Sequence, residues 1–172
     1  MLLKIIGVTT VLITSTGIGM KMAQKLEGRL RDLRTFMVGL QILEREIAFL
    51  SNSLPDAFIK ISYIKGNTSH IFKECGDILK SKQGYCVEEA WEKAFEKYYM
   101  NTFLEDEDRQ ILLNLGKSLG AYDIENQIQN IKMITSQLGI QEKKAEENIA
   151  KNSKLYKSLG VLAGLAIVIV LL

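Results

Sequence analysis

Two apolar segments, one at each end, enclose a charged middle in this chain of 172 residues. From Leu2 to Met20 only Lys4 carries a charge. At about 1.5 Å per residue this segment would form a helix of roughly 28 Å, close to the ~30 Å hydrocarbon core of a bilayer. The sequence therefore predicts a transmembrane anchor within residues 1–20.

The second apolar segment, Leu159 to Leu172, is shorter. Its helix would measure about 21 Å, so a full crossing also needs Leu155 and Tyr156, with Lys157 extending to the interface. A run of this length is more typical of a buried core helix, but a helix apolar on every face would then need protein all around it. We expect residues 158–172 to form a C-terminal transmembrane segment.

The N-terminal segment also resembles a cleaved export signal, because a basic residue precedes an apolar core. No A-x-A-like tripeptide follows that core, only Gly17-Ile18-Gly19-Met20, and no cysteine lies near enough for lipid attachment. These features favour an uncleaved anchor.

Both segments contain pairs of small residues four positions apart. Such pairs let two membrane helices approach closely, although the same spacing often arises by chance because glycine and serine are common in membrane helices. The candidate packing residues are Ser15, Gly19, Gly160 and Gly164.

The middle, residues 21–157, has the size of one domain and contains a single proline and no low-complexity linker. The net charge of +2 lacks the basic excess of a nucleic-acid-binding protein. Basic residues cluster on the domain side of both apolar segments, which predicts a cytoplasmic domain, although Lys4 on the far side opposes this. In the cytoplasm Cys75 and Cys86 would be reduced.

The hydrophobic period of the middle is helical almost throughout, and no segment alternates as a strand. A long first helix, continuous with the N-terminal segment, ends near Asn52. Its predicted apolar stripe is Leu26, Leu30, Leu33, Met37, Leu40, Leu43, Ile47 and Leu50. Ser53 then caps a short second helix, which Gly66-Asn67 closes.

Four further helices follow. The third covers about residues 69–81, and the fourth begins at Glu88 with Trp91 and Phe95 on its apolar face. The fifth begins within 105–108 and ends within 116–120. Asp123 caps a long sixth helix, whose stripe is Ile124, Ile128, Ile131, Ile134 and Leu138. We expect its charged part, 141–157, to be a solvated link to the membrane.

No catalytic constellation is evident. His70 is the only histidine, so a histidine-rich metal site is excluded, and Cys75 lies five positions on, a poor spacing for a nucleophile pair on one helix. The acidic run 105–108 suits a helix start better than a metal site, because it lacks the ligand pattern of a calcium loop. The Gly-Lys-Ser at 116–118 lacks the Walker glycine spacing. We predict no cofactor and no metal.

Four stretches resemble one known family: LEREIAF at 43–49, EEAWEKAF at 88–95, LGKSLGAYDIENQ at 115–127 and the C-terminal KNSKLYKSLGVLAGLAIVIVLL. On these the whole chain resembles the stage III sporulation protein AB family of endospore-forming bacteria. It departs from the family pattern at Leu30, where proline is expected, and in the LSNSLP loop. Six positions belong to the family pattern without an assigned role: Glu46, Trp91, Asp108, Gly116, Gly120 and Gln127.

The resemblance implies a protein of the mother-cell membrane around the forespore, with a helical cytoplasmic domain similar to the platform proteins of type II secretion and type IV pilus systems. The partners it implies are the secretion-type sporulation ATPase of the same operon and the ring-forming proteins of the channel between mother cell and forespore. It leaves room for a homo-oligomer.

The sequence thus predicts an all-α fold, a six-helix antiparallel bundle flanked by two transmembrane helices. The expected function is a non-enzymatic platform that couples the ATPase to the membrane rings, because a bundle without a catalytic site is suited to holding partners. The alternative is a membrane-anchored ligand sensor or enzyme with a pocket in the bundle, using His70, Cys75 and the acidic run 105–108.

Overall fold

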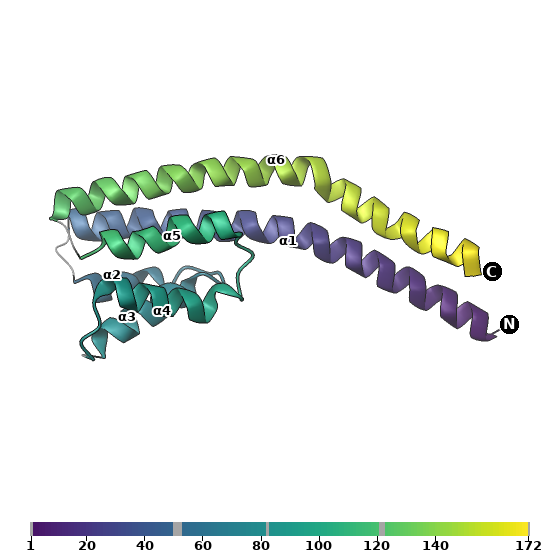
Figure 1. Cartoon of the computed structure of the whole chain (residues 1–172), viewed down its shortest axis with the longest axis horizontal. Helices are drawn as coiled ribbons and strands as arrows, with labels where there is room; N and C mark the ends of the chain where they lie inside the picture. Colours follow the sequence, from purple (N-terminus) through teal and green to yellow (C-terminus); the bar gives the residue numbers. More distant parts are fainter. Residues whose placement is uncertain (1, 50–52, 82, 121–122, 172) are drawn as a thin grey trace. The chain divides into compact units, whose positions relative to one another are not determined.

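The computed structural model describes residues 2–49, 53–81, 83–120 and 123–171, and within these ranges all side chains except those of residues 2–6, 8, 157, 170 and 171. The described residues form six α-helices and no strand. Figure 1 shows them in chain order as α1 (Leu2–Phe49), α2 (Leu54–Ile61), α3 (Ser69–Lys80), α4 (Val87–Tyr99), α5 (Asp106–Ser118) and α6 (Ile124–Leu171). The prediction of an all-α fold with six helices is confirmed.

The chain divides into two compact units. The central unit is Arg29–Lys143, and the end unit combines Met1–Gly28 with Lys144–Leu172. The central unit therefore lies inside the range 21–157 that the sequence suggested as one domain.

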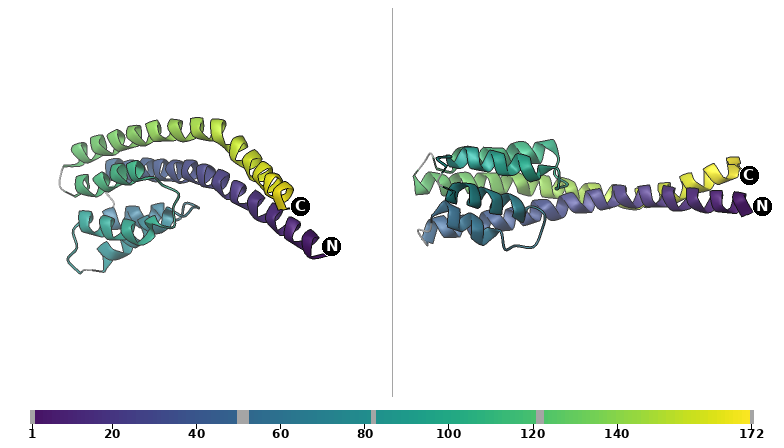
Figure 2. Two further views of the ribbon diagram at one scale, coloured as in Figure 1. Left: turned by 45° about the vertical axis from the view of Figure 1, so that its right-hand side comes forward. Right: turned by 90° about the horizontal axis from the view of Figure 1, so that it is seen from below.

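Within the central unit, the short helices α2, α3 and α4 lie on one side of α1, and α6 lies on the other side with α5 nearby (Figures 1 and 2). Three contacts between α1 and α6 fix their antiparallel direction. Arg34 Nε lies 2.7 Å from Glu142 Oε1, Lys132 Nζ lies 3.5 Å from Glu44 Oε1, and Arg29 donates to Gln141. Residues later in α1 thus meet residues earlier in α6.

Aromatic side chains fill the core between α1 and the short helices. Phe36 of α1 packs on Phe72 of α3 and Phe95 of α4, with ring centroids 5.4 and 6.2 Å apart. Phe58 of α2 stacks on Trp91 of α4 at 5.7 Å. All five rings are almost completely removed from solvent, so this cluster supplies much of the apolar burial that holds the unit together.

The buried stripe of α1 only partly matches the predicted one, because Leu26 and Leu30 are half-buried and Leu50 lies outside the described residues. Leu33, Leu40, Leu43 and Ile47 are buried as expected. Between them Phe36 is completely buried, whereas Met37 is only half-buried. A large ring reaches across the helix surface to the aromatic core, which a count of spacings does not reveal.

The predicted starts of α2 at Ser53 and of α6 at Asp123 are confirmed. Ser53 is the N-cap residue of α2, and its hydroxyl donates to Asp56 Oδ2 at 2.5 Å. Asp123 precedes α6 and accepts through Oδ1 from the Asn126 N–H at 2.9 Å. Ile124 is an exception, because it was expected to face the core and is instead exposed in the first turn of α6.

The expected transmembrane helices are not supported. Among the residues whose side chains are described, neither α1 nor α6 holds a stretch long and apolar enough to cross a membrane. The outermost parts of both predicted segments lie outside the described side chains.

Candidate functional site

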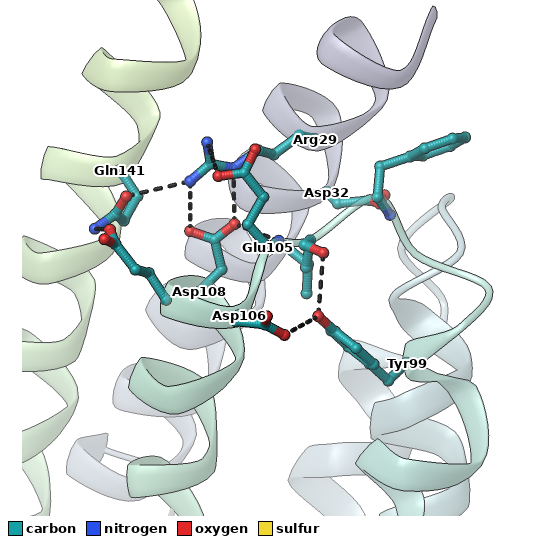
Figure 3. Close-up of polar contacts among 10 residues, drawn as sticks. Arg29, Asp32, Tyr99, Glu105, Asp106, Asp108 and Gln141 are labelled. Atoms are coloured by element: carbon teal, nitrogen blue, oxygen red, sulfur yellow. Dashed lines mark hydrogen bonds and ion pairs between the residues drawn. The ribbon is translucent and has the colours of Figure 1, made fainter. Parts of the chain in front are cut away.

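Arg29 of α1 carries its guanidinium into the central unit, where only 5% of the residue is exposed. Its Nε and Nη2 donate to the two carboxylate oxygens of Asp108 at 2.8 and 2.9 Å. This is the bidentate geometry of a strong arginine–carboxylate pair. Asp108 is completely buried in the first turn of α5, so the pair joins α1 to α5 away from solvent (Figure 3).

Three more side chains surround this pair. Arg29 Nη1 lies 2.7 Å from Glu105 Oε2, and Nη2 also donates to Gln141 Oε1 of α6 at 3.2 Å. Gln141 in turn donates through Nε2 to Glu107 Oε2 at 3.0 Å. The five residues, named the ionic cluster below, therefore connect three helices that are distant in the sequence.

Asp108 also organises the start of its own helix. Its Oδ2 accepts the Glu105 N–H at 2.9 Å, which is one half of a capping box. The two oxygens of Asp108 are thus shared between a helix cap and a cation. The acidic run 105–108 is therefore both the helix start predicted from sequence and the anionic half of a buried ion pair.

The charge state of the cluster follows from its neighbours. Burial alone would lower the pKa of Arg29, but the hydrogen bond and charge of Asp108, with the charges of Glu105 and Glu107, raise that pKa above its ordinary value. Arg29 is therefore a permanent cation. Its role is to hold carboxylates in place, not to exchange protons.

A second buried carboxylate lies one turn along α1. Asp32 is 6% exposed and accepts the Phe103 N–H at 2.7 Å, which attaches the segment between α4 and α5 to α1 (Figure 3). Burial raises the pKa of Asp32, while the Phe103 hydrogen bond and the charge of Arg31 act against that rise. The hydroxyl of Tyr99, the last residue of α4, lies 3.3 Å from both the Leu104 carbonyl and Asp106 Oδ1.

Three family-pattern positions meet at the contact of α4 with α5. Trp91 is completely buried and donates through Nε1 to the Leu112 carbonyl at 2.8 Å. A Cβ on Gly116 would lie 2.8 Å from Trp91 Cδ1, so glycine leaves the space that the indole occupies. Gly120 adopts a φ of +97°, and a Cβ there would also lie 3.1 Å from Val87 Cγ2. These positions serve packing and a turn.

The other two family-pattern positions are on the long helices. Glu46 of α1 is 3% exposed, and its Oε1 pairs with Lys60 Nζ of α2 at 2.5 Å. Gln127 lies in the first turn of α6, where its N–H donates to the Asp123 carbonyl at 3.0 Å.

The four candidate packing residues come together within the end unit. The Ser15 hydroxyl donates to the Gly160 carbonyl. A Cβ on Gly19 would lie 3.1 Å from the Gly160 Cα, and one on Gly164 would lie 2.8 Å from Ser15 Oγ. The backbones of α1 and α6 therefore approach closely at this point because all four residues are small.

The residues considered for chemistry are not brought together. His70 stacks on Tyr98 with ring centroids 5.6 Å apart. Cys75 is buried, and burial raises the pKa of its thiol to about 12, whereas Cys86 is exposed. In the described part of the chain no group of three or more His, Cys, Asp or Glu side chains is arranged to hold a metal ion.

Sequence reasoning missed the role of Arg29 and Asp32. From the sequence, Arg29 is one of the basic residues that follow the first apolar segment and indicate a cytoplasmic domain. A signal was nevertheless present, because Arg29 lies three residues after Leu26 and four before Leu33, on the apolar face of the helix. A charge at such a position requires a buried partner. Nothing in the sequence identifies that partner as Asp108.

Comparisons with known proteins agree on one family. Residues 4–172 match the stage III sporulation protein AB family. The chain is 31% identical over 172 residues to stage III sporulation protein AB of Bacillus subtilis (strain 168), covering 99% of this chain and 100% of that protein. It is also similar to a solved structure of stage III sporulation protein AB, with a TM-score of 0.67 and 27% identity over 71% of this chain and 96% of the other. The chain therefore belongs to the stage III sporulation protein AB family.

Proposed function

We propose that this protein is a non-enzymatic scaffold of the sporulation apparatus, which holds a secretion-type ATPase of the same operon to the ring-forming proteins of the mother cell–forespore channel. Membership of the family supports a role in sporulation. The coupling role rests on the similarity to platform proteins of secretion systems that the family resemblance implies. It is compatible with a rigid helical unit that offers exposed faces to partners.

The observation that carries this proposal is that the buried charged residues bond to other parts of the protein and hold its helices together. Arg29, Asp108 and Gln141 bond to one another across three helices, and the acidic run that could have served chemistry is engaged in these bonds and in a helix cap. Such a network specifies how the helices are arranged, and it engages both oxygens of the buried Asp108 in structural bonds. A fixed arrangement of helices is what a scaffold requires.

The proposal places the protein at the mother-cell membrane, with the central unit in the cytoplasm. The end unit supports this location through its exposed apolar side chains, which include Ile13 at 74% and Ile169 at 75% exposure. Single exposed apolar residues are ordinary, but a series along two paired helices is typical of a membrane or protein interaction site. The basic residues that flank the apolar segments favour the cytoplasmic side.

The partner assignment is tested by purification of the tagged full chain from sporulating cells in mild detergent, with bound proteins identified by mass spectrometry. We expect the operon ATPase and the ring proteins to co-purify. An unrelated membrane protein with the same tag is the control for non-specific capture. Isolation of the protein alone, under conditions that preserve other membrane complexes, would contradict the proposal.

The location is tested with the native thiol of Cys86, which is exposed on the central unit. In vegetative cells made to produce the chain, where the cell membrane faces the medium, a membrane-impermeant maleimide should leave Cys86 unlabelled while the cells are intact and label it after permeabilisation. The Cys86→Ser chain is the matched control, because Cys75 is buried. Labelling of Cys86 in intact cells would place the central unit outside the cytoplasm.

The absence of an enzymatic role is tested by replacing the side chains that the enzyme or sensor alternative would use. His70→Ala, Cys75→Ala and Asp106→Asn should each give normal spore counts. Loss of sporulation in a variant that still folds, judged by its circular dichroism, would favour the enzyme or sensor alternative.

A further inference from the structure

A hollow of about 450 Å³ opens on the central unit where α1 faces the loop between α2 and α3. Its lining from α1 is Arg31, Asp32, Arg34 and Thr35, and from elsewhere Lys65, Gly66, Asn67 and Phe103. Arg31, Arg34, Lys65, Gly66 and Asn67 are all exposed, so the hollow is a surface groove and not an enclosed cavity. It is named the basic groove below.

The loop that forms one wall of the groove lies against α1. Gly66 has a φ of +152°, and a Cβ on this residue would lie 3.3 Å from Thr35 Cγ2. The Thr35 hydroxyl donates to the Arg31 carbonyl at 2.8 Å. These contacts keep Lys65 beside the two arginines of α1, so three cations from two separate segments line one depression.

The charges in the groove are only partly neutralised. Arg34 is paired with Glu142 of α6 at 2.7 Å. Among the described residues, no ion pair is formed by Arg31 or Lys65, although the charge of Arg31 acts on the Asp32 carboxylate. The groove contains one carboxylate, that of Asp32, which is buried at the base and accepts the Phe103 N–H. The exposed rim is therefore cationic.

We propose that the basic groove binds an acidic segment of a partner protein, one that presents aspartate or glutamate side chains to Arg31 and Lys65. Arginine offers carboxylates a bidentate fork, and arginine and aromatic residues are enriched at protein interfaces. The exposed lining favours a protein segment over a small molecule, because ligand pockets bury most of their ligand. The inference rests on the proposed scaffold function, because it assigns that scaffold a contact surface.

The test uses the full chain in detergent and a fluorescein-labelled decapeptide of alternating glutamate and glycine, with binding followed by fluorescence anisotropy at low salt. We expect binding that weakens as salt is added. The double variant Arg31→Glu/Lys65→Glu should bind about tenfold more weakly or worse. The matched control is Lys73→Glu/Lys117→Glu, which changes net charge equally at exposed lysines outside the groove and should lose less than about twofold.

Equal losses in both double variants would overturn the proposal, because binding would then follow net charge alone. Three other results would also overturn it: no binding of the peptide, equal displacement by pyrophosphate or by vesicles containing phosphatidylglycerol, or a self-associated form that only the groove variant dissociates. None of these results bears on co-purification of the ATPase and ring proteins. The groove and the scaffold function can therefore fail separately.

Discussion

At the scale of single residues, the most consequential feature is a charge on the apolar face of a helix. Arg29 and Asp108 are both buried, and neither could be tolerated there alone. Removing one partner of such a pair destabilises the folded protein far more than replacing both partners, because the remaining charge stays buried and unpaired. The pair therefore specifies the arrangement of α1 and α5 more than it adds net stability.

Arg29→Met should destabilise the central unit by roughly 3–5 kcal/mol, because Asp108 would keep a buried charge without its cation. The double variant Arg29→Met/Asp108→Asn should recover much of that loss, since the asparagine is neutral and its oxygen can still accept the Glu105 N–H. Urea unfolding, followed by the fluorescence of Trp91, measures the stability of both variants. Trp91 is the one tryptophan in the chain. A double variant less stable than Arg29→Met would contradict this account.

Asp32 gives a prediction with a defined pH dependence. Its pKa in the folded protein lies above its ordinary value of 3.8, so folding favours the neutral acid and ionisation weakens the fold. Near pH 7 Asp32→Asn should be at least as stable as the natural chain, because asparagine can accept the Phe103 N–H without a charge. As pH falls through the raised pKa toward 3.8, the natural chain should gain stability relative to the variant.

The measurement for Asp32 is the urea midpoint of both chains at several pH values. Asp77→Asn, at an exposed aspartate of α3, is the control for a general effect of removing one carboxylate. A stability difference between Asp32→Asn and the natural chain that does not change with pH would show that burial does not disfavour the Asp32 carboxylate.

At the scale of helices, the close contact of α1 with α6 in the end unit depends on residues without bulk. A Cβ added to Gly160 would lie 2.9 Å from the Ser15 carbonyl oxygen and 3.1 Å from the Gly19 Cα. Both are backbone atoms, which cannot rotate away as a side chain can. Any larger residue at Gly160 must therefore separate the two helices.

Gly160→Val should shift the distance between spin labels at Ile13 and Leu162 to longer values, measured by double electron–electron resonance in the full chain. Both labelled positions are exposed, so the labels themselves should not disturb packing. Gly17→Val is the matched control, because a Cβ on Gly17 meets nothing within 4 Å. An unchanged distance in Gly160→Val would mean that this contact does not hold the helices together.

At the scale of the whole molecule, the two cysteines report on the folding of the central unit. Cys86 is exposed, while Cys75 is buried with a pKa of about 12, so its thiol is both inaccessible and protonated at neutral pH. One thiol per chain should react rapidly with Ellman's reagent, and the second only as fast as the unit unfolds. Rapid reaction of both thiols in the native protein would contradict the burial of Cys75.

The sequence alone was enough for the order and most of the approximate ends of the helices, because these depend on local interactions. The exception is α2, which ends at Ile61 and not at the predicted Gly66-Asn67. Hydrophobic period, the caps at Ser53 and Asp123, and the turn at Gly120 each act within a few residues. The expected membrane-spanning helices were judged by length and the near-absence of charge, and the described residues do not support them. The family could also be predicted from the sequence, because its motifs are contiguous stretches of residues.

Tertiary structure decided which of these residues meet. The ionic cluster pairs Arg29 with Asp108 across 79 positions, and the end unit joins Ser15 to Gly160 across 145. The rotation of the α1 stripe toward Phe36 and the fit of Trp91 over Gly116 also depend on neighbouring helices. Periodicity shows that a helix face is buried, but the choice among many apolar or charged partners is made only when all helices pack together.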